Sequence, residues 1–230
     1  MFYLFSELTL TQLPLSELEY GAFLSYSPRG DSVEIRRSQG ICLDLKRDRV
    51  LSPSIPMSQW VAQTIQQNMD VLPFASFFKS NTILVPVPTH SLMKQDTLWV
   101  PERLATALVK MGLGKSVYQY LIRFKALRKS ASSLTGNRPT PTEHYESLVV
   151  QKNLTDPEPD EILLIGDVVT RGHTFLGAAS RLFSAYPNAH IRAFAAIRTM
   201  SNPSDFKKLY DPCTGTITFR PQFDDTLRRP

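Results

Sequence analysis

The stretch ILLIGDVVTRGHT, residues 162–174, predicts a buried strand that leads directly into a glycine-containing loop. Residues 162–165 are all apolar with no polar alternation, which is typical of a strand covered on both faces in a parallel sheet. Asp167 follows this run after one intervening residue, at the carboxyl end of the strand, where open α/β sheets bind their ligands. The stretch therefore indicates an α/β fold, a parallel sheet flanked by helices, with a ligand site at the end of this strand.

Residues 170–174 have the composition of an anion-binding loop. Gly172 permits a positive φ and a close approach of a ligand to the backbone, and Thr170 and Thr174 offer hydroxyl groups on either side of it. Apolar residues recur at helical spacing beyond the loop, so the loop lies at a helix N-terminus, where N–H groups and the helix dipole favour a phosphate. The alternative is an ordinary strand–turn–helix junction in which Asp167 caps the helix. The order and spacing of the residues favour the phosphate loop.

This segment resembles the motif by which type I phosphoribosyltransferases bind phosphoribosyl pyrophosphate (PRPP). In that family an apolar strand leads to two acidic residues, two aliphatic residues and then Thr-x-Gly-x-Thr. One position departs from the motif, since Gly166 stands where the family has its first acidic residue. The positions that match are Asp167, Val168, Val169, Thr170, Gly172 and Thr174.

The resemblance implies the type I phosphoribosyltransferase fold and a role for each residue of the motif. It assigns Asp167 to the ribose, as the catalytic residue, and it implies Mg²⁺ as a cofactor held through the ligand, with no direct protein ligand. A charged hydrogen bond contributes about 1.5–3 kcal/mol, so the missing carboxylate at Gly166 is expected to weaken PRPP binding by about ten- to a hundredfold. Arg171 and His173 are expected to act mainly through their backbone amides. The expected PRPP- and phosphate-binding residues are Asp167, Val168, Thr170, Arg171, Gly172, His173 and Thr174.

A second apolar strand, ILVPVP at residues 83–88, leads into Thr89 and His90 and precedes an amphipathic helix at residues 101–111. This order resembles the ComF group, amidophosphoribosyltransferase-like proteins linked with DNA uptake, and in type I enzymes the loop after this strand contacts pyrophosphate. Residues 93–100, MKQDTLWV, lack the Gly-Phe-Asn-Gln run common in that group, so we expect an incomplete pyrophosphate site. In a plainer interpretation the prolines only stiffen the strand exit and His90 is a surface residue.

Residues 121–142 form a basic segment without any acidic residue. Such a loop could close over pyrophosphate and Mg²⁺ and exclude water, or it could hold the phosphate backbone of a nucleic acid. The alternative is a solvated loop, because runs of charge are usually exposed. The candidate pyrophosphate-binding residues, from this segment and the loop after the second strand, are Thr89, His90, Arg123, Lys125 and Lys129.

Length and composition bound the class of protein. The chain has 230 residues, of which 42% are hydrophobic and 20% charged, and this suffices for a full core. No apolar run approaches the roughly 20 residues that cross a bilayer, and no basic region precedes the apolar residues at the N-terminus, so we expect a cytoplasmic protein without membrane contact. Cys42 and Cys213 are the only cysteines, so the chain lacks the four-cysteine zinc module with which ComF proteins often begin.

The chain is expected to divide into a small N-terminal α+β extension, residues 1–79, and a phosphoribosyltransferase-like domain, residues 80–230. In the extension, turn residues predict three short strands, at residues 20–26, 33–37 and 41–45. A helix with an apolar face follows them. The extension could form part of the hood that selects the acceptor base, or a separate partner-binding unit. The C-terminal residues 228–230 are expected to fray.

Three functions fit the sequence. We favour a phosphoribosyltransferase that transfers phosphoribose from PRPP to a nitrogen nucleophile and releases pyrophosphate, because Asp167 and the loop are retained. The alternative is a non-catalytic protein that senses PRPP or a nucleotide, or assists DNA processing, which Gly166 and the missing Gly-Phe-Asn-Gln run favour. A nucleic-acid binder that uses the net charge of +5 is the least favoured. The sequence leaves the acceptor base and any oligomer open.

Overall fold

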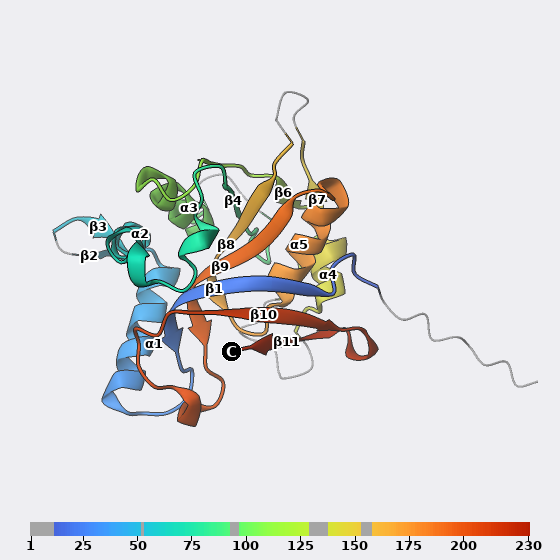
Figure 1. The fold of residues 1–230 in the computed structure, drawn as a ribbon. Coiled ribbons are helices and arrows are strands. Elements are labelled where there is room, and N and C mark those ends of the chain that lie inside the picture. Colours follow the sequence, from blue (N-terminus) through green and yellow to red (C-terminus); the bar gives the residue numbers. More distant parts are fainter. Residues whose placement is uncertain (1–11, 52, 93–96, 129–137, 153–157) are drawn as a thin grey trace, which may run out of the picture.

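The computed structural model describes residues 12–51, 53–92, 97–128, 138–152 and 158–230. Its centre is a seven-stranded sheet in which five neighbouring strands run parallel and two antiparallel strands extend one edge (Figure 1). The architecture is therefore α/β with a mostly parallel sheet. In spatial order the strands are β11 (Asp225–Arg229), β10 (Cys213–Arg220), β1 (Glu17–Tyr26), β9 (His190–Thr199), β8 (Glu161–Val169), β4 (Ile83–Pro86) and β5 (Ser116–Val117).

β8 carries the stretch that predicts the fold, and it lies near the middle of the sheet. Its residues 162–165 are at most 1% exposed, and β8 pairs in parallel with β4 on one side and β9 on the other. The register places Leu164 beside Val85 of β4 and Ala193 of β9. A strand with both faces covered has no position for a polar side chain, which explains the uninterrupted apolar run. The predicted buried parallel strand is confirmed.

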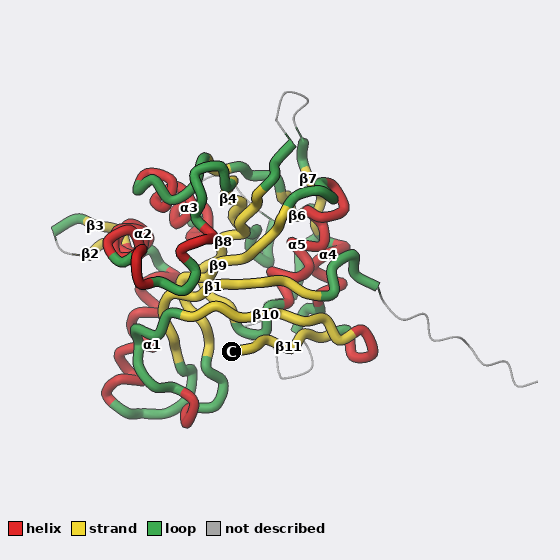
Figure 2. Tube along the Cα trace, viewed as in Figure 1, coloured by secondary structure: helices red, strands yellow, loops and turns green. Residues whose placement is uncertain are grey.

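Helices cover both faces of the sheet (Figure 1, Figure 2). One face is covered by α1 (Val33–Lys46), α2 (Met57–Gln67) and α3 (Val100–Lys110). The other is covered by α5 (His173–Ala185), against which α4 (Pro141–Glu146) packs. No helix in the described ranges has both the length and the apolarity needed to cross a membrane.

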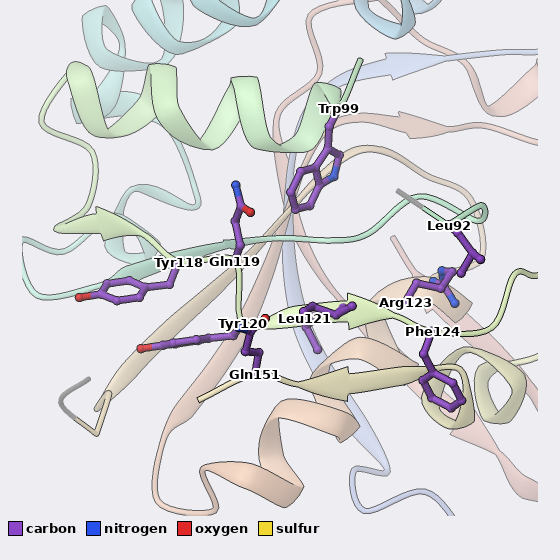
Figure 3. Close-up of a pocket in the computed structure, with 10 residues that line it drawn as sticks. Leu92, Trp99, Tyr118, Gln119, Tyr120, Leu121, Arg123, Phe124 and Gln151 are labelled. Atoms are coloured by element: carbon purple, nitrogen blue, oxygen red, sulfur yellow. The ribbon is translucent and has the colours of Figure 1, made fainter. Parts of the chain in front are cut away.

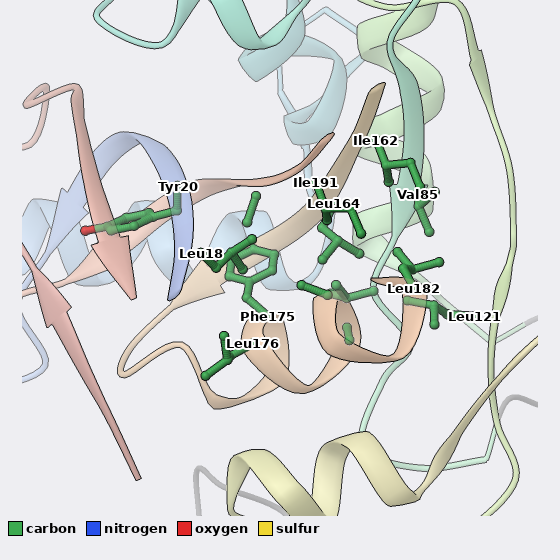
Figure 4. Packing of buried hydrophobic residues seen from close by; sticks show 14 of the residues in the cluster. Leu18, Tyr20, Val85, Leu121, Ile162, Leu164, Phe175, Leu176, Leu182 and Ile191 are labelled. Carbon is green, nitrogen blue, oxygen red and sulfur yellow. The ribbon is translucent and has the colours of Figure 1, made fainter. Parts of the chain in front are cut away.

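The core consists of two clusters separated by the sheet. Side chains alternate along a strand, so Leu163 and Ile165 of β8 pack with α1, α2 and α3. Ile162 and Leu164 point to the opposite face and pack with α5, as Figure 4 shows. Burial on both faces holds β8 in place, and it fixes which way each residue beyond Ile165 points.

The carboxyl ends of β4 and β8 form the switch point of the sheet. From β4 the chain passes through α3 to β5, whereas from β8 it passes through α5 to β9, on the opposite side and over the opposite face (Figure 1). The two connections therefore leave in opposite directions. Open α/β sheets bind ligands at the strand ends where this happens, and both sequence motifs end there.

Residues 33–37 and 41–45 are helical, so the prediction of two short strands is wrong. They belong to α1, whose N-cap residue Ser32 accepts a hydrogen bond from the Ile35 amide. The buried residues of the helix recur at a spacing of three or four, namely Ile35, Ser38, Cys42 and Leu45. Gly40 is one of the residues that predict a turn between these two strands, but it lies inside the helix.

The N-terminal segment contributes to the main sheet and to the core. β1, which contains the predicted strand at residues 20–26, lies between β9 and β10, and α1 and α2 share a cluster with α3. The residues of β1, α1 and α2 therefore pack in the same two clusters as the rest of the described chain. The remaining elements are β2 (Val50–Leu51), β3 (Ile55–Pro56), β6 (Leu121–Arg123), β7 (Leu148–Val150) and the 3₁₀ helices η1 (Met69–Val71), η2 (Ala75–Phe77), η4 (Pro203–Asp205) and η5 (Pro221–Phe223).

Candidate functional site

β8 connects tightly to α5, as the sequence predicts. The strand ends at Val169, and α5 begins at His173 with Gly172 as its N-cap residue at φ 98°. A Cβ at residue 172 would lie 2.7 Å from Ile217, so both the backbone angle and the available space require glycine. Asp167 is not the helix cap, and no side chain that the structure describes caps α5. The first N–H groups of α5 are therefore suited to bind a ligand.

Asp167 lies on the α1 side of the sheet. Its half-buried carboxyl is close enough to Cys42 and Lys46 of α1 to interact with both through charge. Burial raises the pKa of Asp167, while the backbone N–H of Val168 and the charge of Lys46 oppose the rise. Within the described ranges Asp167 forms no salt bridge. The carboxyl group can therefore accept hydrogen bonds from a hydroxylated ligand.

Gly166 lies directly against the aromatic ring of Phe175. A Cβ at residue 166 would be 2.6 Å from Cζ of Phe175, which is closer than two carbon atoms pack. Phe175 is only 3% exposed and belongs to the core under the sheet. The ring therefore fills the space that a carboxylate would need at this position.

The C-terminal hairpin of β10 and β11 is tied to the loop between β8 and α5. Arg228 donates through Nε to the Thr170 carbonyl and through Nη2 to the Thr199 carbonyl, both at 2.7 Å. Thr226 donates through its hydroxyl to the Arg171 carbonyl, also at 2.7 Å. The expectation that residues 228–230 fray is therefore wrong for Arg228, which lies in β11 and fastens the loop.

The side chains of Arg171 and His173 are directed at Asp225 of the hairpin. His173 Nε2 lies 2.6 Å from Asp225 Oδ1, and Arg171 Nη1 lies 3.4 Å from both carboxylate oxygens. Burial raises the pKa of Asp225, but the hydrogen bonds from His173 and the Thr226 backbone and the charge of Arg171 outweigh it, so the pKa is lowered. These two side chains therefore contact the hairpin. A ligand at the loop would bind to the backbone N–H groups of the loop.

Arg123 of β6 is a buried cation at the exit of β4. Only 3% exposed, it donates through Nε to the Thr89 carbonyl at 2.5 Å and through Nη1 to the Ser147 hydroxyl. Its Nη2 lies 3.4 Å from His144 Nδ1. Burial lowers the pKa of Arg123 to about 10, so the guanidinium stays charged at neutral pH. No described carboxylate forms a salt bridge with it.

His144 of α4 joins this cation to the start of α5. Burial, and then the charges of Arg123 and His173, lower the pKa of His144 to about 3, so its imidazole is neutral. A guanidinium can only donate, so Nδ1 of His144 accepts and the ring proton is on Nε2. Nε2 lies 3.3 Å from the Thr174 hydroxyl and donates to it. The polar groups thus run from Thr89 through Arg123 and His144 to Thr174.

The structure brings together some of the predicted pyrophosphate-binding residues. Thr89 and His90 follow β4, and the His90 carbonyl accepts the Leu127 amide at 2.8 Å, which fastens the basic segment to this loop. Lys125 is exposed, and Lys129 lies outside the described residues. Of the predicted pyrophosphate-binding cations that the structure describes, Arg123 is the one buried at the strand ends.

Sequence reasoning missed His144, Ser147 and the hairpin residues Asp225 and Arg228. The capping box of Thr140 and Glu143 could have predicted the start of α4. It could not have shown that the next residues meet Arg123, since that contact depends on tertiary packing.

Comparisons with known proteins add no assignment. No family model matches this chain, and no curated protein matches it. The described residues contain no group of three or more His, Cys, Asp or Glu side chains that could hold a metal ion. The chemistry that the arrangement supports is binding of an anion that also carries hydroxyl groups, through backbone N–H groups, Asp167 and a buried guanidinium.

Proposed function

We propose that the protein binds a phosphoribosyl ligand, PRPP or a nucleoside 5′-phosphate, in the crevice between the carboxyl ends of β4 and β8. The observation that carries the proposal is the N-terminus of α5, which no described side chain caps, at the switch point of the sheet. In this proposal the 5′-phosphate binds to the N–H groups of residues 172–174, and the Thr174 hydroxyl adds a donor. Asp167 accepts hydrogen bonds from the ribose hydroxyls.

The hairpin contacts support this assignment of the loop. Arg228 and Thr226 bind the carbonyls of Thr170 and Arg171. In a trans peptide the C=O of one residue and the N–H of the next point in opposite directions. The N–H groups of Arg171 and Gly172 therefore point away from β11. In this proposal the hairpin fixes the orientation of these two peptide groups, and their N–H groups are the donors that an anion would bind.

Arg123 supports the binding of a second anionic group beside the loop after β4. Two arginines are buried at this end of the sheet. Arg198 pairs with Asp211, whereas the neighbours of Arg123 that the structure describes, Thr89, Ser147 and His144, are all neutral. Pyrophosphate of PRPP would give Arg123 a counter-charge. Asp167 of β8 is the one acidic residue from Ile162 to the end of α5, so Mg²⁺ would be held mainly by the pyrophosphate oxygens.

The pair of Gly166 and Phe175 favours binding without efficient transfer of phosphoribose. A single carboxylate at the ribose gives less stabilisation to the positive charge that develops on the sugar ring than two would. Transfer to a nitrogen nucleophile is the second candidate, because Asp167 and the loop are retained. In either case the same residues hold the ligand.

The proposal is tested by calorimetric titration of PRPP with Mg²⁺ into the wild type and into Asp167→Asn. The wild type is expected to bind, and the substitution is expected to weaken binding by about tenfold, since a charge-assisted hydrogen bond is lost. Asp205→Asn is the matched control, because it makes the same change at an exposed position of η4. An assay of released pyrophosphate in the same samples distinguishes transfer from binding alone.

Absence of binding at millimolar PRPP in the wild type would overturn the proposal. Equal affinity of the wild type and Asp167→Asn would remove Asp167 from the ribose site.

A further inference from the structure

A cavity of about 700 Å³ lies between the start of α3, the loop after β4 and strand β6, outside the crevice described above. Its size lies within the range of pockets that enclose small organic ligands. Aromatic residues from two stretches of the chain line it, namely Trp99 before α3 and Tyr118, Tyr120 and Phe124 around β6 (Figure 3). A wall of this kind suits a planar ring, which can stack on aromatic faces.

One of these rings, Trp99, is held in a way that suits stacking. It donates its indole N–H to the Val87 carbonyl at 2.9 Å, so the orientation of its ring is fixed before any ligand arrives. Phe124 is 56% exposed, and Figure 3 shows its ring on the other side of β6 from Trp99. Figure 3 shows the Trp99 ring and the Gln119 amide extending into the same space between α3 and β6. An amide there can bond to the polar edge of a ring.

Arg123 also lines the cavity and defines the charge of its occupant. Its side chain bonds to Thr89, Ser147 and His144. A guanidinium carries five N–H donors, so it can bond to a ligand as well. A buried charge without a counter-ion is strongly unfavourable, and an anion in the cavity would offset this. In Figure 3 Arg123 lies beside Leu92 and Phe124, so a charge and an aromatic ring occur together.

We propose that this cavity binds a nucleotide, with the base against Trp99, the phosphate on Arg123 and the Gln119 amide at the edge of the base. The combination of aromatic lining and a buried guanidinium that no described carboxylate neutralises selects an aromatic anion over a neutral ring or a sugar phosphate. The inference uses no residue of the loop between β8 and α5, but it shares Arg123 with the phosphoribosyl proposal.

The test is a titration of the Trp99 fluorescence of Trp60→Phe protein, in which Trp99 is the one remaining tryptophan. The probes are adenosine 5′-monophosphate, adenosine and ribose 5-phosphate. We expect the nucleotide to quench the fluorescence, and the nucleoside and the sugar phosphate each to bind at least about tenfold more weakly. Lack of quenching at millimolar nucleotide, or equal binding of ribose 5-phosphate, would overturn the proposal.

Two variants locate the ligand. Gln119→Leu is expected to weaken nucleotide binding by at least about fivefold, because the hydrogen bond to the edge of the base is lost. It changes an exposed side chain, so the fold is retained. Gln222→Leu makes the same change at another exposed position and is expected to bind as the parent protein does. Arg123→Lys keeps the charge but loses the planar fork and is expected to bind at least about tenfold more weakly.

Asp167→Asn separates this proposal from the phosphoribosyl one. Nucleotide is expected to quench the Trp99 fluorescence of this variant as it does that of the parent protein, even though the variant binds PRPP more weakly. If instead Asp167→Asn abolishes the quenching and Gln119→Leu leaves it unchanged, the nucleotide lies in the crevice and the cavity is not its site.

Discussion

Gly166 lies near the end of β8, and the ring of Phe175 in α5 packs directly against it. Gly166→Asp would place a Cβ 2.6 Å from the Phe175 ring and bury a carboxylate beside it. We expect the free energy of unfolding to fall by about 2 kcal/mol or more, from overpacking and from the buried charge. Urea denaturation of the variant and the wild type measures this difference.

A second substitution checks the cause. Phe175→Leu in the Gly166→Asp background shortens the side chain that blocks residue 166. The double variant is therefore expected to lose less unfolding free energy than the two single variants lose together. Strict additivity would mean that Phe175 is not the obstacle.

His144 gives a prediction for stability against pH. Its pKa is lowered to about 3 in the folded protein, so the unfolded chain takes up a proton first as the pH falls below about 6.5. The neutral ring therefore stabilises the fold above about pH 6.5, and this contribution is lost progressively toward pH 3. Between pH 7 and pH 5 it corresponds to about 2 kcal/mol of unfolding free energy.

His144→Gln tests this directly, because glutamine can accept from Arg123 and donate to Thr174 without titrating in this range. The loss of stability between pH 7 and pH 5, measured by urea denaturation, is expected to be about 2 kcal/mol smaller in the variant. An equal loss in both proteins would show that His144 takes up its proton in the folded state.

Single residues were predictable from the sequence where their role is local. Gly172 follows from the positive φ that a strand–loop–helix connection needs, and the sequence indicates this position directly. The filling of the space at Gly166 by Phe175 depends on how α5 packs under the sheet. The partners of Arg123 come from the loop after β4 and from the region of α4, and no local pattern brings them together.

The C-terminal hairpin makes a prediction at the scale of an element. Arg228 bonds to the carbonyls of Thr170 and Thr199 and to the Tyr20 hydroxyl, so Arg228→Gln should release the loop between β8 and α5 from β11. Hydrogen exchange of the amides of residues 171–174, measured by mass spectrometry, is expected to accelerate by about tenfold or more.

Arg229→Gln is the matched control, because Arg229 is the exposed neighbour of Arg228 in the same strand. Its exchange pattern is expected to match the wild type. Unchanged exchange in Arg228→Gln would show that the hairpin does not restrain the loop.

The elements that the sequence mispredicted owe their structure to long-range contacts. α1 carries valine and isoleucine in short runs around Gly40, a pattern that resembles two strands and a turn. Burial of one face of α1 in the core beside the sheet selects the helix. β11 has few apolar residues, and it is held by its pairing with β10 and by Arg228. In contrast, β8 and α5 carry long apolar patterns and were predicted correctly.

The whole molecule is expected to unfold as one unit. β1 lies inside the main sheet, and α2 shares a cluster with α3, so no boundary in the core separates residues 17–79 from the rest. Trp60 lies in α2 and Trp99 precedes α3, so the two tryptophans report on the two parts of the chain.

Trp60→Phe and Trp99→Phe proteins allow this to be measured. In each, the urea midpoint from the remaining tryptophan is expected to coincide with the midpoint from far-ultraviolet circular dichroism. Separate midpoints would indicate that the N-terminal segment unfolds independently.

At the scale of the molecule, the sequence predicted a parallel sheet flanked by helices, but neither the antiparallel pairing of β10 and β11 at one edge nor the full strand order. The apolar strands and the helices between them indicate parallel neighbours. The insertion of β1 between β9 and β10 pairs residues about two hundred positions apart, such as Glu17 and Thr218, and sequence periodicity contains no information on such pairing. The sequence predicts the ends of β4 and β8 separately, but it does not show that these two strand ends lie side by side.

The position of the 5′-phosphate is the central claim, and a crystal structure of the protein with PRPP and Mg²⁺ tests it most directly. We predict the 5′-phosphate within hydrogen-bonding distance of the backbone N–H groups of residues 172–174, with a ribose hydroxyl bonded to Asp167. A 5′-phosphate bound elsewhere, for example at Arg123 in the aromatic cavity with the start of α5 empty, would contradict the account.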